Sequence, residues 1–145
     1  MTHELVTDPL LTAYPVFCEE LKECVPVMLR YGMELSEKQI RYLYEERADA
    51  LKQTGRMEFG ESAVKKLILA FCSSPYLSRE CPENEIGDLL AAFYEWKNIT
   101  RERFGDDELI EIMRNYYDGK AEGSVEKILD LTEEEIAELC FKEEV

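Results

Sequence analysis

Apolar residues recur along this chain every three to four positions, and alternation between apolar and polar residues never persists for five positions. A spacing of 3.6 residues places apolar side chains on one face of a helix, whereas strict alternation indicates a half-buried strand. The pattern therefore predicts an all-α fold, a compact bundle of six or seven short helices with no sheet. No linker, internal repeat or low-complexity stretch interrupts it, so residues 1–145 are expected to form a single helical domain.

The expected helix ends are marked by residues that favour a specific backbone geometry. Ser36 and Gln39 have the spacing of a capping box at the start of the second helix, and Gly55 offers a left-handed stop after it. Pro26 should kink or split the first helix, because proline cannot donate the intrahelical hydrogen bond, and Asp106 is expected to cap the fifth. The expected helices cover residues 14–32, 36–54, 60–72, 83–104 and 106–117, with a short one from residue 124 and a last one from residue 132.

The third of these helices ends in the run LILAFC, residues 67–72, which is apolar on all sides. A helix with no polar face is typical of a central, buried position. The run is also the longest apolar stretch of the chain, and it is far shorter than the roughly 18 residues of a membrane span. The first twelve residues, MTHELVTDPLLT, have no basic region ahead of an apolar core, so we expect no signal peptide and a cytoplasmic protein.

The formal net charge of -15 is unevenly spread, with -4 on residues 1–29, +2 on residues 30–79, -3 on residues 80–101 and -10 on residues 102–145. A nucleic acid would be repelled by such a chain, so nucleic-acid binding is not expected. The acidic C-terminal part is interpreted as a solvated helix face that aids solubility.

The residues that usually carry catalysis or bind metals are sparse or badly spaced. The five cysteines, at positions 18, 24, 72, 81 and 140, form no C-x-x-C pair, so neither a disulfide framework nor a zinc site is expected. The only histidine, His3, removes Cys–His and Ser–His catalysis unless the N-terminus folds back into a cleft. We therefore expect no metal, no cofactor and no catalytic residue, although carboxylate-only or arginine-assisted chemistry remains open.

The segment GRMEFGES, residues 55–62, has the spacing of a phosphate-binding loop, G-x-x-x-x-G-K-[ST], with Glu61 in place of the lysine. Such a loop follows a strand and uses the lysine to neutralise phosphate charge. Here a helix is predicted before the segment, and the glutamate would repel the ligand. The two glycines, Gly55 and Gly60, are therefore interpreted as the stop of one helix and the approach to the next.

A weaker anion site remains open at the same place. The free amides at the start of the third helix, with Arg56, Lys65 and Lys66 close by, could hold a carboxylate or phosphate group. The alternative is that these cations pair with Glu58, with Glu61 or with the acidic C-terminal helices.

Arg47 lies on the buried stripe of the second helix, which positions 40, 43, 44, 48 and 51 form. A guanidinium there must meet a carboxylate or helix-end carbonyls, because an unpaired buried charge costs several kcal/mol. We interpret Arg47 as one half of an ion pair that pins helix packing, with a ligand-binding arginine as the alternative.

Two other motifs have a chemical and a structural interpretation. Residues 118–126, DGKAEGSVE, resemble a calcium loop in having glycine sixth, but Lys120 occupies the third position and Leu129 the twelfth, where a bidentate glutamate is needed. The run FYEW, residues 93–96, points aromatic side chains around the fourth helix. One of them is therefore expected to reach the surface, and an exposed Tyr94 or Trp96 would suit a contact with another protein, although a core position is the default.

Several segments taken together resemble an uncharacterised domain family of Firmicutes bacteria: GRMEFGES, KLILAFCSSPYL, FYEWKN, DDELIEIM and YDGKAEGS, in this order. The resemblance covers roughly residues 30 to 130. It implies a bacterial, cytoplasmic setting and no activity, ligand or catalytic residue. The chain departs from the family's usual run where Glu61 and Ser62 follow Gly60 and where Glu95 and Trp96 replace a Tyr-Phe pair.

These observations favour a non-enzymatic helical protein that acts by binding a protein partner or by self-association, without nucleic acid or membrane. The alternative is a small-molecule or anion sensor that uses Arg47, Arg56 and the start of the third helix. A deep pocket with both arginines facing into it would favour the sensor. An exposed apolar patch would favour the protein binder.

Overall fold

The computed structural model describes the backbone of residues 9–142 and the side chains of residues 13–142. Within this range the chain forms eight helices and no strand, which confirms the predicted all-α fold. The number of helices is one more than the upper end of the six or seven that the sequence predicts. They are α2 (Pro9–Lys22), α3 (Val25–Arg30), α4 (Glu37–Thr54), α5 (Ala63–Phe71), α6 (Pro82–Ile99), α7 (Asp106–Asp118), α8 (Val125–Leu129) and α9 (Glu133–Lys142). The extra helix arises where the first predicted helix divides into α2 and α3, beside Pro26 in the opening turn of α3.

The predicted ends of α4 are confirmed in atomic detail. The Oγ of Ser36 accepts a hydrogen bond from the Gln39 amide at 3.1 Å, and the Gln39 Oε1 accepts one from the Ser36 amide at 2.7 Å. Gly55 ends the helix with φ of 68°, the left-handed conformation that glycine adopts without strain.

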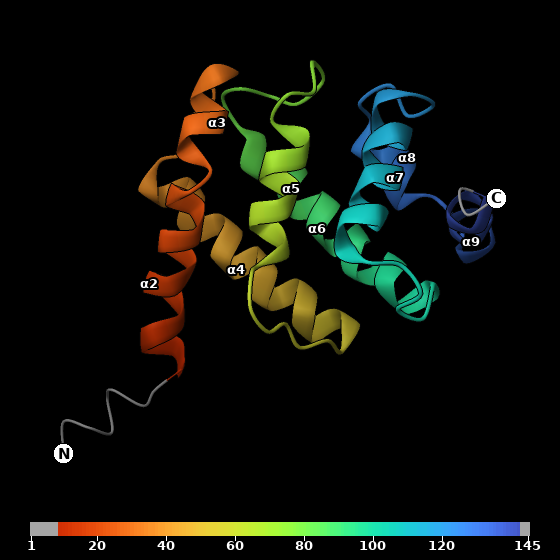
Figure 1. The fold of residues 1–145 in the computed structure, drawn as a ribbon, viewed down its shortest axis with the longest axis horizontal. Helices are drawn as coiled ribbons and strands as arrows, with labels where there is room; N and C mark the ends of the chain where they lie inside the picture. Colours follow the sequence, from red (N-terminus) through yellow and green to blue (C-terminus); the bar gives the residue numbers. More distant parts are fainter. Residues whose placement is uncertain (1–8, 143–145) are drawn as a thin grey trace.

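The helix at the centre of the bundle is α6, which contacts α4, α5, α7, α8 and α9. Figure 1 shows α2 and α3 at one end of the molecule and α9 at the other, with α5 and α7 side by side between them. The prediction that the LILAFC helix is buried on all sides is wrong for Leu69, which is exposed, and for Ala70, which is half-buried. Leu69 on α5 is 37% exposed, because α5 packs on α3, α6 and α7 and leaves one face open.

The predicted fourth helix is five residues too long at its end. Helix α6 stops at Ile99, and Arg101 and Glu102 adopt positive φ of 55° and 63°. The turn brings Glu102 onto basic side chains of other elements, described below. Asp106 does not cap α7 as expected: the cap is Gly105, whose amide donates to the Glu108 carboxylate at 3.0 Å.

None of the helices between residues 9 and 142 is both long and apolar enough to cross a membrane. His3 lies outside the described residues.

Candidate functional site

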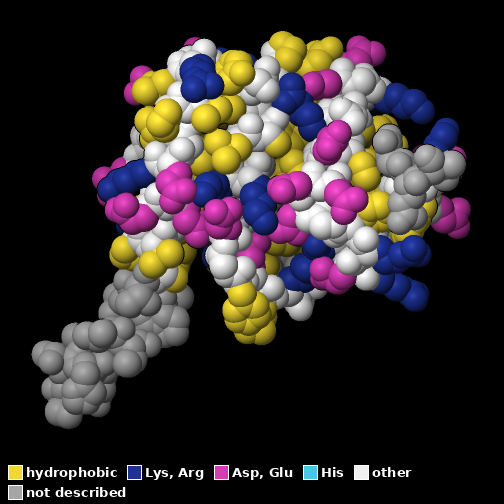
Figure 2. All heavy atoms as spheres, in the orientation of Figure 1, with side chains coloured by type: hydrophobic (Ala, Val, Ile, Leu, Met, Phe, Trp, Pro, Cys, Tyr) yellow, Lys and Arg dark blue, Asp and Glu magenta, His cyan; other side chains and the backbone are white. Residues whose placement is uncertain are grey.

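The segment of residues 56–59, between the end of α4 and the turn at Gly60, faces its charged side chains inward and its apolar side chains outward. Arg56 and Glu58 are partly covered, whereas Met57 is 77% exposed and Phe59 is 81% exposed. Figure 2 shows hydrophobic surface that projects from the connection between α4 and α5. Successive side chains of an extended backbone point to opposite sides. Apolar side chains usually face the core and charged side chains the solvent, and here the two are exchanged. We call residues 56–59 the inverted segment.

Glu58 holds the inverted segment to the body of the protein. Its Oε1 accepts a hydrogen bond from Arg47 Nε at 2.7 Å, and its Oε2 accepts from the Tyr94 hydroxyl at 2.8 Å and from the Ala63 amide at 3.1 Å. The side chains of Arg47 and Glu58 are only 19% and 11% exposed. One carboxylate therefore ties together α4, α5 and α6.

The surroundings of this cluster keep Arg47 charged and Tyr94 neutral. Burial acts to lower the pKa of Arg47, but the hydrogen bond and the charge of Glu58 outweigh it and raise that pKa. Burial, and then the neighbouring Glu58 charge, raise the pKa of Tyr94 far above its ordinary value. Tyr94 is therefore a neutral hydrogen-bond donor and not a general base at physiological pH.

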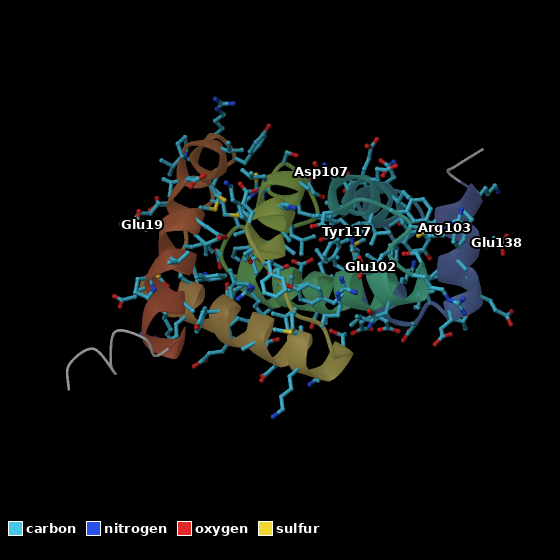
Figure 3. The ribbon with its side chains drawn as sticks, turned by 60° about the horizontal axis from the view of Figure 1, so that its bottom comes forward. Glu19, Glu102, Arg103, Asp107, Tyr117 and Glu138 are labelled. Atoms are coloured by element: carbon cyan, nitrogen blue, oxygen red, sulfur yellow. The ribbon has the colours of Figure 1, made fainter. Side chains whose placement is uncertain are left out.

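Arg56 holds the other inward position of the inverted segment. It donates to the Asn98 side-chain oxygen at 2.8 Å and forms an ion pair with Glu102. Figure 3 shows Glu102 in the connection that follows α6. The hydrogen bond from Arg56 lowers the pKa of Glu102 despite some desolvation, with a further contribution from Lys97, whose Nζ lies 3.4 Å away.

The start of α5, the proposed anion site, is already filled by the chain itself. The Ser62 amide donates to the Glu20 carboxylate at 2.9 Å, and the Val64 amide donates to the Ser62 hydroxyl at 3.1 Å. The Ala63 amide donates to Glu58. An external anion would have to displace two carboxylates from these donors.

The four cations considered for that site each lie against a carboxylate and do not converge. Arg47 pairs with Glu58, and Arg56 pairs with Glu102. Lys65 Nζ lies 2.6 Å from Glu23 and 3.1 Å from Glu61, and Lys66 Nζ lies 2.9 Å from Asp106. This geometry agrees with the ion-pair interpretation of these residues.

A pocket of about 170 Å³ beside Arg56 is not suited to binding an anion. Lys97 also lines it, but so do the carboxylates of Glu58, Glu102 and Asp106. Arg47 is absent from its wall, so the two arginines of the sensor hypothesis do not face this pocket together.

The remaining chemical motifs have structural roles in the described chain. Asp118, the first residue of the calcium-like loop, accepts hydrogen bonds from Ser74 Oγ at 2.8 Å and from Arg114 Nε at 2.6 Å. Among the residues that the structure describes, no three His, Cys, Asp or Glu side chains are placed to hold a metal ion.

The comparison with protein families gives a match over residues 20–144, to a family of unknown function, DUF6323. The chain belongs to the DUF6323 family. The match includes the inverted segment and every helix from α3 to α9 in full. Neither the curated proteins nor the solved structures contain a match to the chain.

The expectation that Tyr94 or Trp96 reaches the surface of this DUF6323 protein is wrong. The two residues are 2% and 1% exposed, because neighbouring helices cover α6 on several sides. The exposed residue of that run is Glu95. Sequence reasoning missed Met57 and Phe59, whose signal was the alternation Arg-Met-Glu-Phe between two glycines.

Proposed function

We propose that this DUF6323 protein is a non-enzymatic binding module that contacts another protein through the inverted segment. The observation that supports the proposal is the pair of large apolar side chains, Met57 and Phe59, held outward at 77% and 81% exposure. Full burial of such a side chain contributes about 1.5–3 kcal/mol. Aromatic residues and methionine are enriched at protein interfaces, and two of them on adjacent outward positions form a compact anchor.

The anchor is held in place before a partner arrives. Glu58 and Arg56 lie between and beside the apolar residues, and their ion pairs and hydrogen bonds fix the backbone from which Met57 and Phe59 project. Binding costs about 0.5–1.5 kcal/mol for each flexible side chain that becomes ordered, and loop ordering adds to this cost. Fixing the backbone in advance lowers that cost.

The partner we propose is a different protein that has an apolar pocket with basic residues around it. Two copies of a chain with formal charge of -15 repel each other, whereas a basic partner is attracted and its approach accelerated. A cytoplasmic setting in a Firmicutes bacterium is part of the same proposal. Cys18, Cys24, Cys72 and Cys81 are free thiols, which fits a reducing compartment.

The test is quantitative affinity capture from the native cell with two matched variants. Met57→Ser combined with Phe59→Ser removes the anchor, and Val16→Ser combined with Leu29→Ser removes two other side chains, 59% and 53% exposed, from α2 and α3. Both variants should melt close to the wild type. We expect a stoichiometric partner that the first variant loses and the second keeps. Equal capture by the two variants would refute the proposal, and so would mass measurements that show only a second copy of the chain.

A further inference from the structure

A groove of about 480 Å³ lies between α5 and α7, and Glu61, two residues after the inverted segment, lines one edge of it. Its apolar surface comes mainly from Leu69 and Ala70, and Ile110, which is 3% exposed, lies beneath them. Leu69 is 37% exposed although it stands in the most apolar run of the sequence. The groove is therefore the face that α5 leaves open after it has packed on its neighbours.

The charge that this groove shows to solvent is negative. Asp107 and Glu111 are exposed and make no ion pair within the described part of the chain. Glu61 completes the acidic edge, and its side chain stays 56% exposed beside Lys65. Figure 3 shows Asp107 at the junction of α5 and α7.

The two cations of the same groove are already engaged. Lys66 Nζ lies 2.9 Å from Asp106, and Arg114 Nε lies 2.6 Å from Asp118. Arg114 also donates to the Ala70 carbonyl, and to Ser73 Oγ at 3.0 Å. Carboxylates of the protein itself neutralise these two cations, so the negative charge of Asp107 and Glu111 is not neutralised within the groove.

We propose that the groove binds an amphipathic helix of the partner protein, with leucine-like residues on Leu69 and Ala70 and lysines or arginines against Asp107 and Glu111. This rests on the proposed function and names the chemistry of its partner. Two adjacent helices form a groove that suits the ridges of a third helix. Helix α5 has nine residues, about 13 Å at 1.5 Å per residue, so the groove accommodates between two and three turns.

The probe is a synthetic helical peptide of leucine and lysine, with leucine at positions i, i+3, i+4 and i+7, and the same peptide with glutamate in place of lysine. Fluorescence anisotropy of the labelled peptides with the full-length protein measures affinity, and amide chemical shifts of the protein locate the contact. We expect saturable binding of the lysine peptide only, with shift changes concentrated on α5 and α7.

Matched variants separate the groove from a general attraction between opposite charges. Asp107→Asn with Glu111→Gln should weaken binding roughly five-fold, from two exposed pairs of about 0.5 kcal/mol each. Glu19→Gln with Glu138→Gln removes the same charge from α2 and α9, at opposite ends of the molecule (Figure 3), and should change affinity less than two-fold. Leu69→Ser should weaken binding about ten-fold, and Leu129→Ser, at a side chain that is 47% exposed on α8, should not.

Equal weakening by the two charge pairs, or shift changes away from α5 and α7, would overturn the inference. Absence of binding at millimolar peptide would also overturn it, as would self-association of the protein that Leu69→Ser abolishes. The proposed function has a separate test. If the partner is lost with the Met57 and Phe59 variant but retained with the Asp107 and Glu111 variant, the inverted segment stands as a binding site and the groove does not.

Discussion

Removal of the Glu58 carboxylate should destabilise the protein more than removal of Arg47, its partner in the ion pair. Glu58 accepts hydrogen bonds from three donors, Arg47 Nε, the Tyr94 hydroxyl and the Ala63 amide, at 2.7, 2.8 and 3.1 Å. Glu58→Ala leaves all three without this acceptor. Breaking a buried pair from one side costs about 3–5 kcal/mol, and an orphaned neutral donor costs about 1–3 kcal/mol.

The expected magnitude is at the lower end of these ranges, because the pair is not fully enclosed. The Arg47 side chain is 19% exposed and can turn its charge toward water. We expect a loss of about 3 kcal/mol for Glu58→Ala. Arg47→Met keeps the apolar packing and leaves Glu58 with its two other donors, so its expected cost is about 1 kcal/mol.

Urea unfolding of the two variants and of Glu58→Gln, which keeps an acceptor oxygen, gives the free energies directly. In thermal melts each kcal/mol corresponds to about 2–4 °C for a domain of this size. The glutamine variant should fall between the wild type and the alanine variant. Negligible effects of both Glu58→Ala and Arg47→Met would show that the pair is solvated, and a larger cost for Arg47→Met would refute the reasoning from orphaned donors.

Three further predictions follow from single residues. Gly55→Ala should cost on the order of 1 kcal/mol, because alanine would be strained at φ of 68°, and a lower urea midpoint with an unchanged m-value would show it. Glu61→Lys completes the phosphate-loop consensus but should confer no ATP or GTP affinity, because α4 and not a strand precedes the loop; micromolar binding in calorimetric titration with magnesium would contradict this. Asp88→Asn should raise stability at pH 7. Partial desolvation, and then the charge of Glu85, raise the pKa of Asp88 although the residue is exposed, so its ionised form slightly opposes folding above its unfolded value of about 3.9. The advantage of the variant should shrink as the pH falls toward about 4, and urea midpoints whose difference is independent of pH would exclude this cause.

Local chemistry made part of the fold predictable from the sequence. The capping box of Ser36 and Gln39 and the left-handed stop at Gly55 involve residues within a few positions of each other, so their geometry follows from the sequence alone. The end of α6 could not be predicted in this way. Arg101 and Glu102 adopt left-handed backbone where Glu102 meets Arg56, and a contact between residues so far apart in the chain is invisible to a local pattern.

The candidate site was predicted in part for the same reason. Arg47 on a buried stripe required a partner, but the sequence could not say that Glu58 would supply it while also binding Tyr94. The sequence predicts that one aromatic residue of the FYEW run reaches the surface, because the run places aromatic side chains around the helix, with a core position as the default for Tyr94 and Trp96. In the structure α6 contacts five other helices, and its solvated face carries Asp88, Glu95 and Asn98, so the three aromatic residues of the run are all buried.

The inward charges of the inverted segment decide what its surface can do. Well-packed apolar side chains at positions 56 and 58 would stabilise the fold as well as or better than a buried ion pair, and polar ones at 57 and 59 would suit solvent. The chain has the opposite arrangement, which leaves Met57 and Phe59 exposed and gives the isolated protein no hydrophobic stabilisation from them. Gly55 and Gly60, with φ of 68° and 78°, bound the segment with left-handed turns, so neither α4 nor α5 can extend through it and bury these residues. The two glycines that imitate a phosphate loop in the sequence therefore separate the exposed Met57 and Phe59 from the helices on either side of them.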